Sequence, residues 1–177
     1  MFAVKLPTIS RGFKPIAEDN ARVLILGTLP GAVSLIKREY YAQERNQFWQ
    51  IVGAIFEFPP NLTYKERKTK LRQAGIALWD VCAAAHRKGS LDTAIRSARV
   101  NAFSRFFRAH RNVELICFNG KRAERLYRRL VLPTLTLQAQ KLSYKLLPST
   151  SPAHASMSFK RKLRVWRNAL TSLDQPR

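Results

Sequence analysis

The chain has 177 residues, of which 46% are hydrophobic, and this length suits one domain with a substantial buried core. Lys and Arg total 32 against 11 Asp and Glu, which gives a formal net charge of +21 at pH 7. This excess repels itself unless an anionic partner screens it, and nucleic acid is the commonest such partner. An acidic membrane is the competing interpretation, but we find neither a lipidation motif nor an apolar run of spanning length.

The N-terminal sequence, MFAVKLPTISRGF, lacks the continuous apolar stretch of a signal peptide. We therefore expect a cytoplasmic protein of the bacterial type that associates with the nucleoid when it binds DNA. Cys82 and Cys117 lie in apolar segments and are expected to be buried free thiols. Two cysteines are too few for the usual iron–sulfur cluster, which takes about four. The three histidines lie far apart, so we expect no metal and no cofactor.

Apolar, β-branched runs alternate along the chain with segments of helical spacing. Residues 21–28 predict a buried strand, residues 46–56 an amphipathic helix, and residues 62–74 an exposed, highly charged helix. Residues 75–81 predict a second strand, and the later strand candidates are residues 113–118 and 141–147. The later helix candidates are residues 100–109, 121–130 and 156–173.

This alternation predicts an α/β fold, a three-layer αβα sandwich with a central, mostly parallel four-stranded sheet. Each strand candidate ends in a small, polar or proline-containing loop: GTLPG, WDV, FNG and PSTSP. Ligand sites of such sheets lie beyond the carboxyl ends of the strands, so we expect a site there. No repeat or linker divides the sequence. We expect a single domain over residues 1–177, with about 15 N-terminal residues and the last few flexible.

Two rigid loops and one aromatic segment are the candidates for a binding site. Residues 27–31 (GTLPG) and 148–154 (PSTSPAH) combine prolines that preset the backbone with hydroxyls and amides that bind phosphate oxygens. One interpretation is that the two loops bind a DNA backbone between them. The alternative is that they are two ordinary turns. Between them, residues 40–49 (YYAQERNQFW) place aromatics beside amides, as suits a pocket that stacks a base and reads its edge. The alternative is that Phe48 and Trp49 are core residues, which we favour for at least one of them.

Taken together and in order, the motifs resemble the hypoxanthine-DNA glycosylase branch of the uracil-DNA glycosylase superfamily. The matching blocks are GTLPGAVSLIKREYYAQERNQFW, GIALWDVCAAAHRKGSLDTAI, ICFNGK and LPSTSPAHASMSFKRKLRVW, with Asn101 at a familiar distance after the second. They span nearly the whole chain, from about Val23 to Trp166. The first block is also similar to mismatch-specific uracil glycosylases, which share the Gly-x-x-Pro-Gly turn and the Asn-x-Phe-Trp block.

The resemblance implies a DNA repair enzyme that flips a deaminated base out of double-stranded DNA and hydrolyses its N-glycosidic bond without cutting the strand. Hypoxanthine is the expected base, and a monomer is expected. Related branches place Asp or Asn in the first motif to orient water, where this chain has Thr28 and Leu29. The implied catalytic residue is instead Asn46, whose carboxamide would hold the water or the base edge. Gln43-Glu44 replaces the His-Pro pair expected just before it.

The resemblance also assigns the remaining site residues. The base pocket is expected to contain Thr28, Leu29, Pro30, Gly31, Tyr41, Phe48 and Asn119. The DNA backbone and minor groove are expected to contact Ser34, Ser149, Thr150, Ser151, Pro152, Ala153 and His154. His154 would support the leaving base or cap its loop. Asp80 is the candidate buried carboxylate, with a structural role favoured over that of a base, and Asp92 is expected to cap a helix.

Two other functions are compatible with the same residues. One is a uracil or mismatch-specific glycosylase, against which the absence of Asp or Asn from the first motif argues. The other is a non-catalytic nucleic-acid-binding protein on the same fold, which the charge supports equally well. Whether Asn46, Tyr41 and His154 share one concave pocket distinguishes an active site from a plain binding surface.

Overall fold

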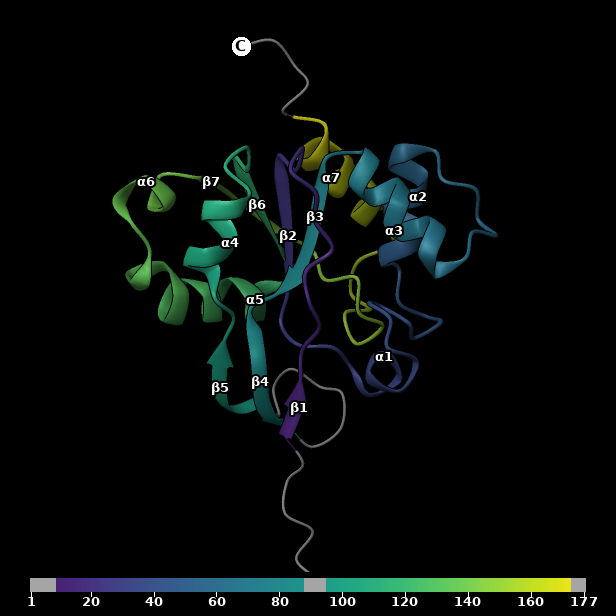
Figure 1. Ribbon diagram of the computed structural model, residues 1–177. Coiled ribbons are helices and arrows are strands. Elements are labelled where there is room, and N and C mark those ends of the chain that lie inside the picture. The colour runs from purple at the N-terminus through teal and green to yellow at the C-terminus, as the bar shows by residue number, and fades with distance from the viewer. Residues whose placement is uncertain (1–8, 88–94, 173–177) are drawn as a thin grey trace, which may run out of the picture.

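The computed structural model describes residues 9–87 and 95–172, which form a sheet covered by helices on both faces (Figure 1). The sheet consists of β2 (Val23–Gly27), β3 (Ile76–Asp80), β6 (Leu115–Asn119) and β7 (Ser143–Leu147), in the order β3-β2-β6-β7. Every neighbouring pair is parallel. The predicted four-stranded parallel sheet is therefore confirmed, and each strand begins within two residues of its predicted start.

Two helical layers cover the sheet. One contains α2 (Phe48–Phe56), α3 (Tyr64–Gln73) and α7 (Phe159–Leu170), and the other contains α4 (Phe103–Ala109), α5 (Lys121–Leu126) and α6 (Leu137–Gln140) (Figure 1). Successive strand side chains point to opposite faces. In β2, Val23 and Ile25 join the core beneath α2, α3 and α7, whereas Leu24 and Leu26 join the core on the α4–α5 side. A strand buried on both faces must be apolar throughout, as β2 is.

A small antiparallel sheet extends from the end of β3. Its strands are β1 (Ile9–Arg11), β4 (Cys82–Arg87) and β5 (Ile95–Val100), in the order β1-β4-β5. This sheet was not predicted from the sequence. The helix predicted to begin at residue 100 begins at Phe103, as α4, because Val100 ends β5. Ile9–Arg11 belong to the N-terminal segment that was expected to be flexible, and they pair with β4 as β1. Asp92 lies outside the described residues.

Three shorter features complete the chain. Helix α1 (Ala32–Lys37) follows the loop after β2, and α5 continues into a π-helical turn (Tyr127–Val131) and a 3-10 turn (Leu132–Thr134).

Both cysteines are free and buried, as predicted, and burial raises the pKa of the Cys117 thiol to about 12. Within the part of the chain that the structure describes, no helix is long and apolar enough to cross a membrane.

Candidate active site

The carboxyl ends of β2, β3 and β6 open into a cavity of about 280 Å³. Gly27, Asp80 and Asn119, the last residues of these strands, form part of its wall. The volume is near the lower end of small-molecule pockets, about 300 Å³, and so suits a compact ligand. The cavity brings together most of the predicted site: Thr28, Leu29, Pro30, Gly31, Ser34, Tyr41, Asn46, Asn119, Ser149, Thr150, Ser151, Ala153 and His154. Tyr40 and Gln43 also line the cavity; they belong to the candidate segment of residues 40–49 but were not predicted individually as site residues.

Asn119 ties three segments of the wall together. Its Nδ2 donates to the Tyr41 hydroxyl (3.0 Å) and to Thr150 Oγ1 (2.9 Å), and its Oδ1 accepts from the Thr150 backbone N–H (2.9 Å). The Thr150 carbonyl in turn accepts from the backbone N–H of Gln47 (3.0 Å). Thr150 lines the cavity but is 0% exposed, and its contact with a phosphate stays a prediction. Its role is to fix the loop after β7 against the rest of the site.

Tyr41 presents an aromatic ring to the cavity from an unusual backbone conformation, with a φ of 55°. Its ring stacks on that of Phe48, with centroids 4.2 Å apart and planes 26° from parallel. Phe48 is 0% exposed and does not line the cavity, so its predicted place in the base pocket is wrong. Phe48 instead supports Tyr41 from the core, which confirms the core alternative for this residue.

Asn46 lies at the entrance to α2 with its carboxamide fixed at one end. Its Oδ1 accepts from the backbone N–H of Phe48 (3.0 Å), and its own N–H donates to the Gln43 carbonyl (2.8 Å). Over residues 9–87 and 95–172, nothing accepts a hydrogen bond from Asn46 Nδ2. The side chain thus reaches the cavity preoriented, with Nδ2 and a second lone pair of Oδ1 left for a ligand.

The floor of the cavity is closely packed. A Cβ at Gly27 would collide with Asp80 Oδ1 and would lie 2.9 Å from the Tyr41 hydroxyl oxygen, so any side chain there would displace these groups. Asp80 is 3% exposed, as predicted for the buried carboxylate. Burial raises the pKa of the Tyr40 phenol well above its usual value, and the negative charge of Asp80 adds to the effect. The Tyr40 side chain is consequently a neutral part of the wall.

Helix α7 holds the loop after β7 from behind. Trp166 Nε1 donates to the Pro148 carbonyl (2.9 Å), and Lys162 Nζ donates to the His154 carbonyl (2.8 Å). Lys162 is only 2% exposed, and burial lowers its pKa. This lysine was not predicted from the sequence, because it lies in a helix rich in Lys and Arg, where such side chains usually face solvent.

The predicted phosphate ligands differ in their freedom to reach DNA. Ser34 is 5% exposed and its Oγ accepts from the Ala42 N–H (3.1 Å), which ties α1 to the loop before α2. Ser149 Oγ and Ser151 Oγ accept from backbone N–H groups of their own loop, at 3.2 and 3.3 Å. Their hydroxyl hydrogens stay available to an acceptor. Pro152 is half-buried and does not line the cavity, and its contact with the minor groove stays a prediction.

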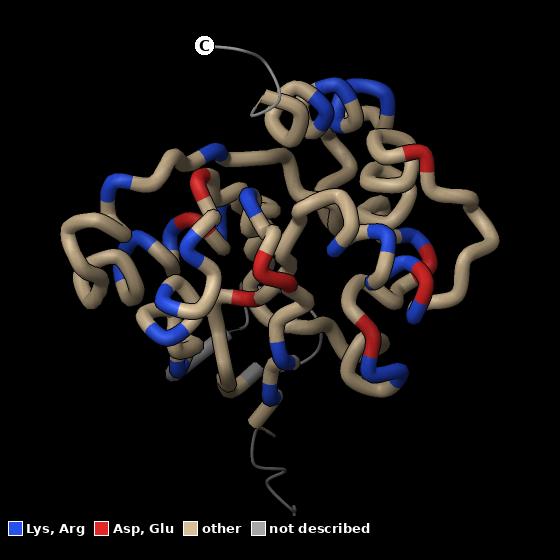
Figure 2. Tube along the Cα trace, turned by 45° about the horizontal axis from the view of Figure 1, so that its top comes forward, with Lys and Arg blue, Asp and Glu red and all other residues tan. Residues whose placement is uncertain are grey.

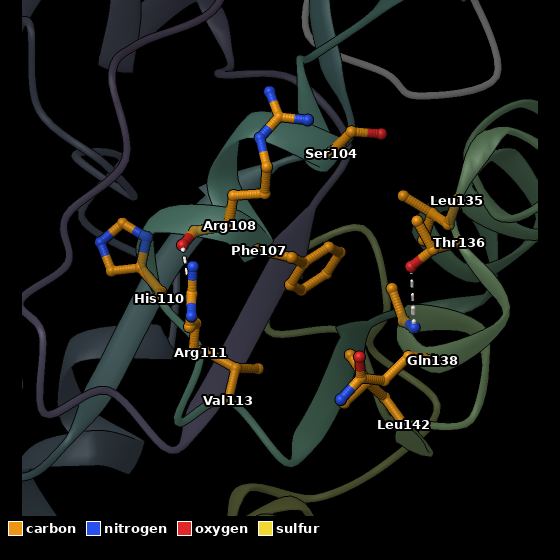
Figure 3. Close-up of a pocket in the computed structure, with 11 residues that line it drawn as sticks. Ser104, Phe107, Arg108, His110, Arg111, Val113, Leu135, Thr136, Gln138 and Leu142 are labelled. Atoms are coloured by element: carbon orange, nitrogen blue, oxygen red, sulfur yellow. Dashed lines mark hydrogen bonds between the residues drawn. The ribbon is translucent and has the colours of Figure 1, made fainter.

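Other hollows lie away from the strand ends. One of about 410 Å³ lies between α4 and α6, with Phe107, Leu135 and Leu142 in its wall (Figure 3). No residue of the predicted site lines it. A groove of about 610 Å³ adjoins the strand-end cavity, and Tyr41, Gln43 and Asn46 belong to the walls of both.

Over residues 14–173 the sequence matches the family described as the uracil DNA glycosylase superfamily. The chain belongs to this superfamily. A "Hypoxanthine DNA glycosylase" of Methanosarcina acetivorans is 37% identical over 155 residues, 87% of this chain and 94% of the relative. Another of the same name, from Methanosarcina barkeri, is 40% identical over 114 residues, 64% of this chain and 72% of the relative.

A solved structure supports the same assignment. The solution NMR structure of a candidate uracil DNA glycosylase from Methanosarcina acetivorans has a TM-score of 0.80 and 33% identity to this chain. The similarity covers 95% of this chain and all of that one. The predicted fold class and family are therefore confirmed, and the activity of the superfamily is that of a DNA glycosylase.

Proposed function

We propose that this protein removes hypoxanthine from double-stranded DNA by hydrolysis, without cutting the strand. The observation that carries the proposal is Asn46, a preoriented carboxamide in the strand-end cavity beside Tyr41 and His154. Thr28 and Leu29, which also line the cavity, have no carboxylate or carboxamide in their side chains to orient water. The names of the two relatives support hypoxanthine as the base.

The reaction breaks the bond between C1′ of the deoxyribose and N9 of the base. The bonding electron pair leaves with the base, which takes up a proton, while the sugar gains oxocarbenium character and water adds at C1′. Such a cationic centre needs a well-placed water more than a strong base. The free lone pair of Asn46 Oδ1 suits this role, because the Phe48 N–H fixes the direction of the carboxamide.

The cavity walls supply the binding. Tyr41, held from behind by Phe48, offers a ring face on which a flipped base can stack. The loop of residues 28–31 brings backbone groups to the same cavity, and the loop of residues 149–154 places hydroxyls at its rim. Within the described part of the chain no lysine lines the cavity, which supports hydrolysis over a mechanism that uses an amine nucleophile.

Asn46→Ala tests the proposal. We expect hypoxanthine release from an inosine duplex to fall by about 100-fold or more, as when one polar group that acts on the transition state is removed. Affinity for the duplex should stay within about 2-fold, because the phosphate contacts are unchanged. Asn46→Asp is the structural control, since it keeps an acceptor for the Phe48 N–H.

Incubation of the parent protein with duplexes that contain inosine, xanthine or uracil distinguishes the alternative functions. Release of uracil without hypoxanthine would replace the substrate assignment by a uracil glycosylase. If high enzyme concentrations release no base from any duplex, the protein is a non-catalytic DNA-binding protein.

A further inference from the structure

Three carboxamides line the strand-end cavity: Gln43, Asn46 and Asn119. Asn119 is committed to the protein, because both Nδ2 hydrogens and one lone pair of Oδ1 are used by Tyr41 and Thr150. Asn46 is anchored through Oδ1 and is assigned to the water. The side chain of Gln43, the third carboxamide, has neither of these roles.

Gln43 Oε1 is shielded from solvent and accepts no hydrogen bond from any residue the structure describes. Its backbone is nevertheless fixed, since its carbonyl accepts from the Asn46 N–H (2.8 Å). A buried amide oxygen without a donor costs about 1–3 kcal/mol, and proteins rarely keep one without a reason. Gln43 itself lines the cavity proposed to receive the base, so a turn of its side chain toward the cavity would bring this oxygen to a donor on the base.

The deaminated bases carry such a donor. Hypoxanthine has a ring N1–H next to its carbonyl, and uracil and xanthine contain the same N–H and C=O pair. Adenine and cytosine have at this position a ring nitrogen that carries a lone pair. An acceptor held at this edge therefore bonds a deaminated base and repels its parent base, and a site built on a hydrogen bond discriminates strongly.

We propose that Gln43 is a specificity-determining residue, whose Oε1 accepts the hydrogen bond of the ring N–H beside the carbonyl of the flipped base. The inference rests on the proposed function, because it assumes that the cavity receives the base. It also gives a role to the Gln that stands where the resemblance predicts a His.

The test compares two bases of the same ring system, hypoxanthine and unsubstituted purine, which lacks both the N1–H and the carbonyl. We expect Gln43→Ala to slow hypoxanthine release in single turnovers by about 10- to 100-fold. This is the effect expected from losing one hydrogen bond in a buried site. Purine release should stay within about 2-fold. Gln43→Glu keeps an acceptor and should retain most of the preference for hypoxanthine.

Gln47→Ala is the matched control. Gln47 Oε1 is also buried with no donor among the described residues, but Gln47 does not line the cavity. Its loss should leave the ratio of hypoxanthine to purine release unchanged. Equal slowing of both bases by Gln43→Ala, or no slowing of either, would overturn the inference.

Binding provides the second measurement. A fluorine at the 2′ carbon of the sugar slows hydrolysis, so the Kd of duplexes with 2′-fluoro hypoxanthine or purine nucleotides reports recognition without chemistry. Gln43→Ala should weaken the hypoxanthine duplex by about 10-fold and leave the purine duplex unchanged. If the parent released no base but this difference appeared, the proposed function would fail and the role of Gln43 in recognition would stand.

Discussion

At the scale of single residues, the site depends on a hydrogen atom in place of a side chain at Gly27. A Cβ there would displace Asp80 Oδ1 or the Tyr41 hydroxyl, both of which are held in the cavity wall. We expect Gly27→Ala to lower the free energy of unfolding by about 1–3 kcal/mol, as overpacking does. It should also slow base release, because the groups that shift, Asp80 and Tyr41, both line the cavity. Urea denaturation and single-turnover kinetics measure the two effects.

Gly53→Ala is the control for this substitution. Gly53 lies inside α2, and a Cβ there would contact Phe58 Cβ at an ordinary 3.6 Å. Alanine in a helix interior is favoured over glycine by about 0.5–1 kcal/mol, so this variant should be more stable and equally active. A Gly27→Ala protein with the stability and activity of the parent would show that the wall adjusts to a methyl group.

Roles of single residues were harder to predict than the identity of the segments. Thr150 was predicted to contact a phosphate and Phe48 to lie beside the base. Thr150 is buried and shares two hydrogen bonds with Asn119, 31 residues away, and Phe48 lies behind Tyr41. Burial of a polar side chain depends on partners far along the chain, which local patterns do not reveal.

At the scale of elements, the loop after β7 depends on α7. Lys162 Nζ donates to the His154 carbonyl from a position that is 2% exposed. We expect Lys162→Met to keep the helix and most of its packing but to leave that carbonyl without its donor. Hypoxanthine release should fall by about 5- to 30-fold. Losing a hydrogen bond from a charged group raises the free energy of the ordered loop by about 1–2 kcal/mol. Circular dichroism and single-turnover kinetics measure the two outcomes.

Lys160→Met is the matched control, because Lys160 lies on the same helix and is exposed. It removes an equal charge from the surface but no hydrogen bond from the loop. The two variants should therefore differ in base release. Equal activities would mean that Trp166, which donates to Pro148, fixes the loop by itself.

The elements themselves were largely predictable where they are long or buried on both faces. Largely apolar runs indicated β2, β3 and β6, and helical spacing indicated α2 and α7. The segment of β7 was also predicted as a strand, although it contains two lysines and a serine. The small sheet was missed because Cys82–Arg87 contains three alanines in succession and shows no alternation of apolar and polar residues. Its pairing with distant β1 and β5 decides its structure, so tertiary contacts override the local propensity.

At the scale of the whole molecule, the charge exceeds what the fold can neutralise. With 32 basic and 11 acidic residues, at least 21 cations have no acidic partner in the chain even if every acid forms a pair. Lys and Arg are spread over the helices of both layers, and acidic residues are few among them (Figure 2). This distribution favours attraction to DNA from many directions, whereas we propose that the cavity selects the base.

A strong dependence of DNA binding on salt follows from this charge. For undamaged duplex, the logarithm of the association constant should fall linearly with the logarithm of salt concentration. About six phosphate contacts would give a slope near −5 and a loss of about 1,000-fold between about 50 and 200 mM salt. Fluorescence anisotropy with a labelled duplex measures the slope. Single-turnover release at saturating enzyme should vary much less, because the bound base lies in a cavity whose hydrogen bonds are screened little by ions. Affinity that is unchanged between low and high salt would contradict this account and leave the net charge of +21 without a role in DNA binding.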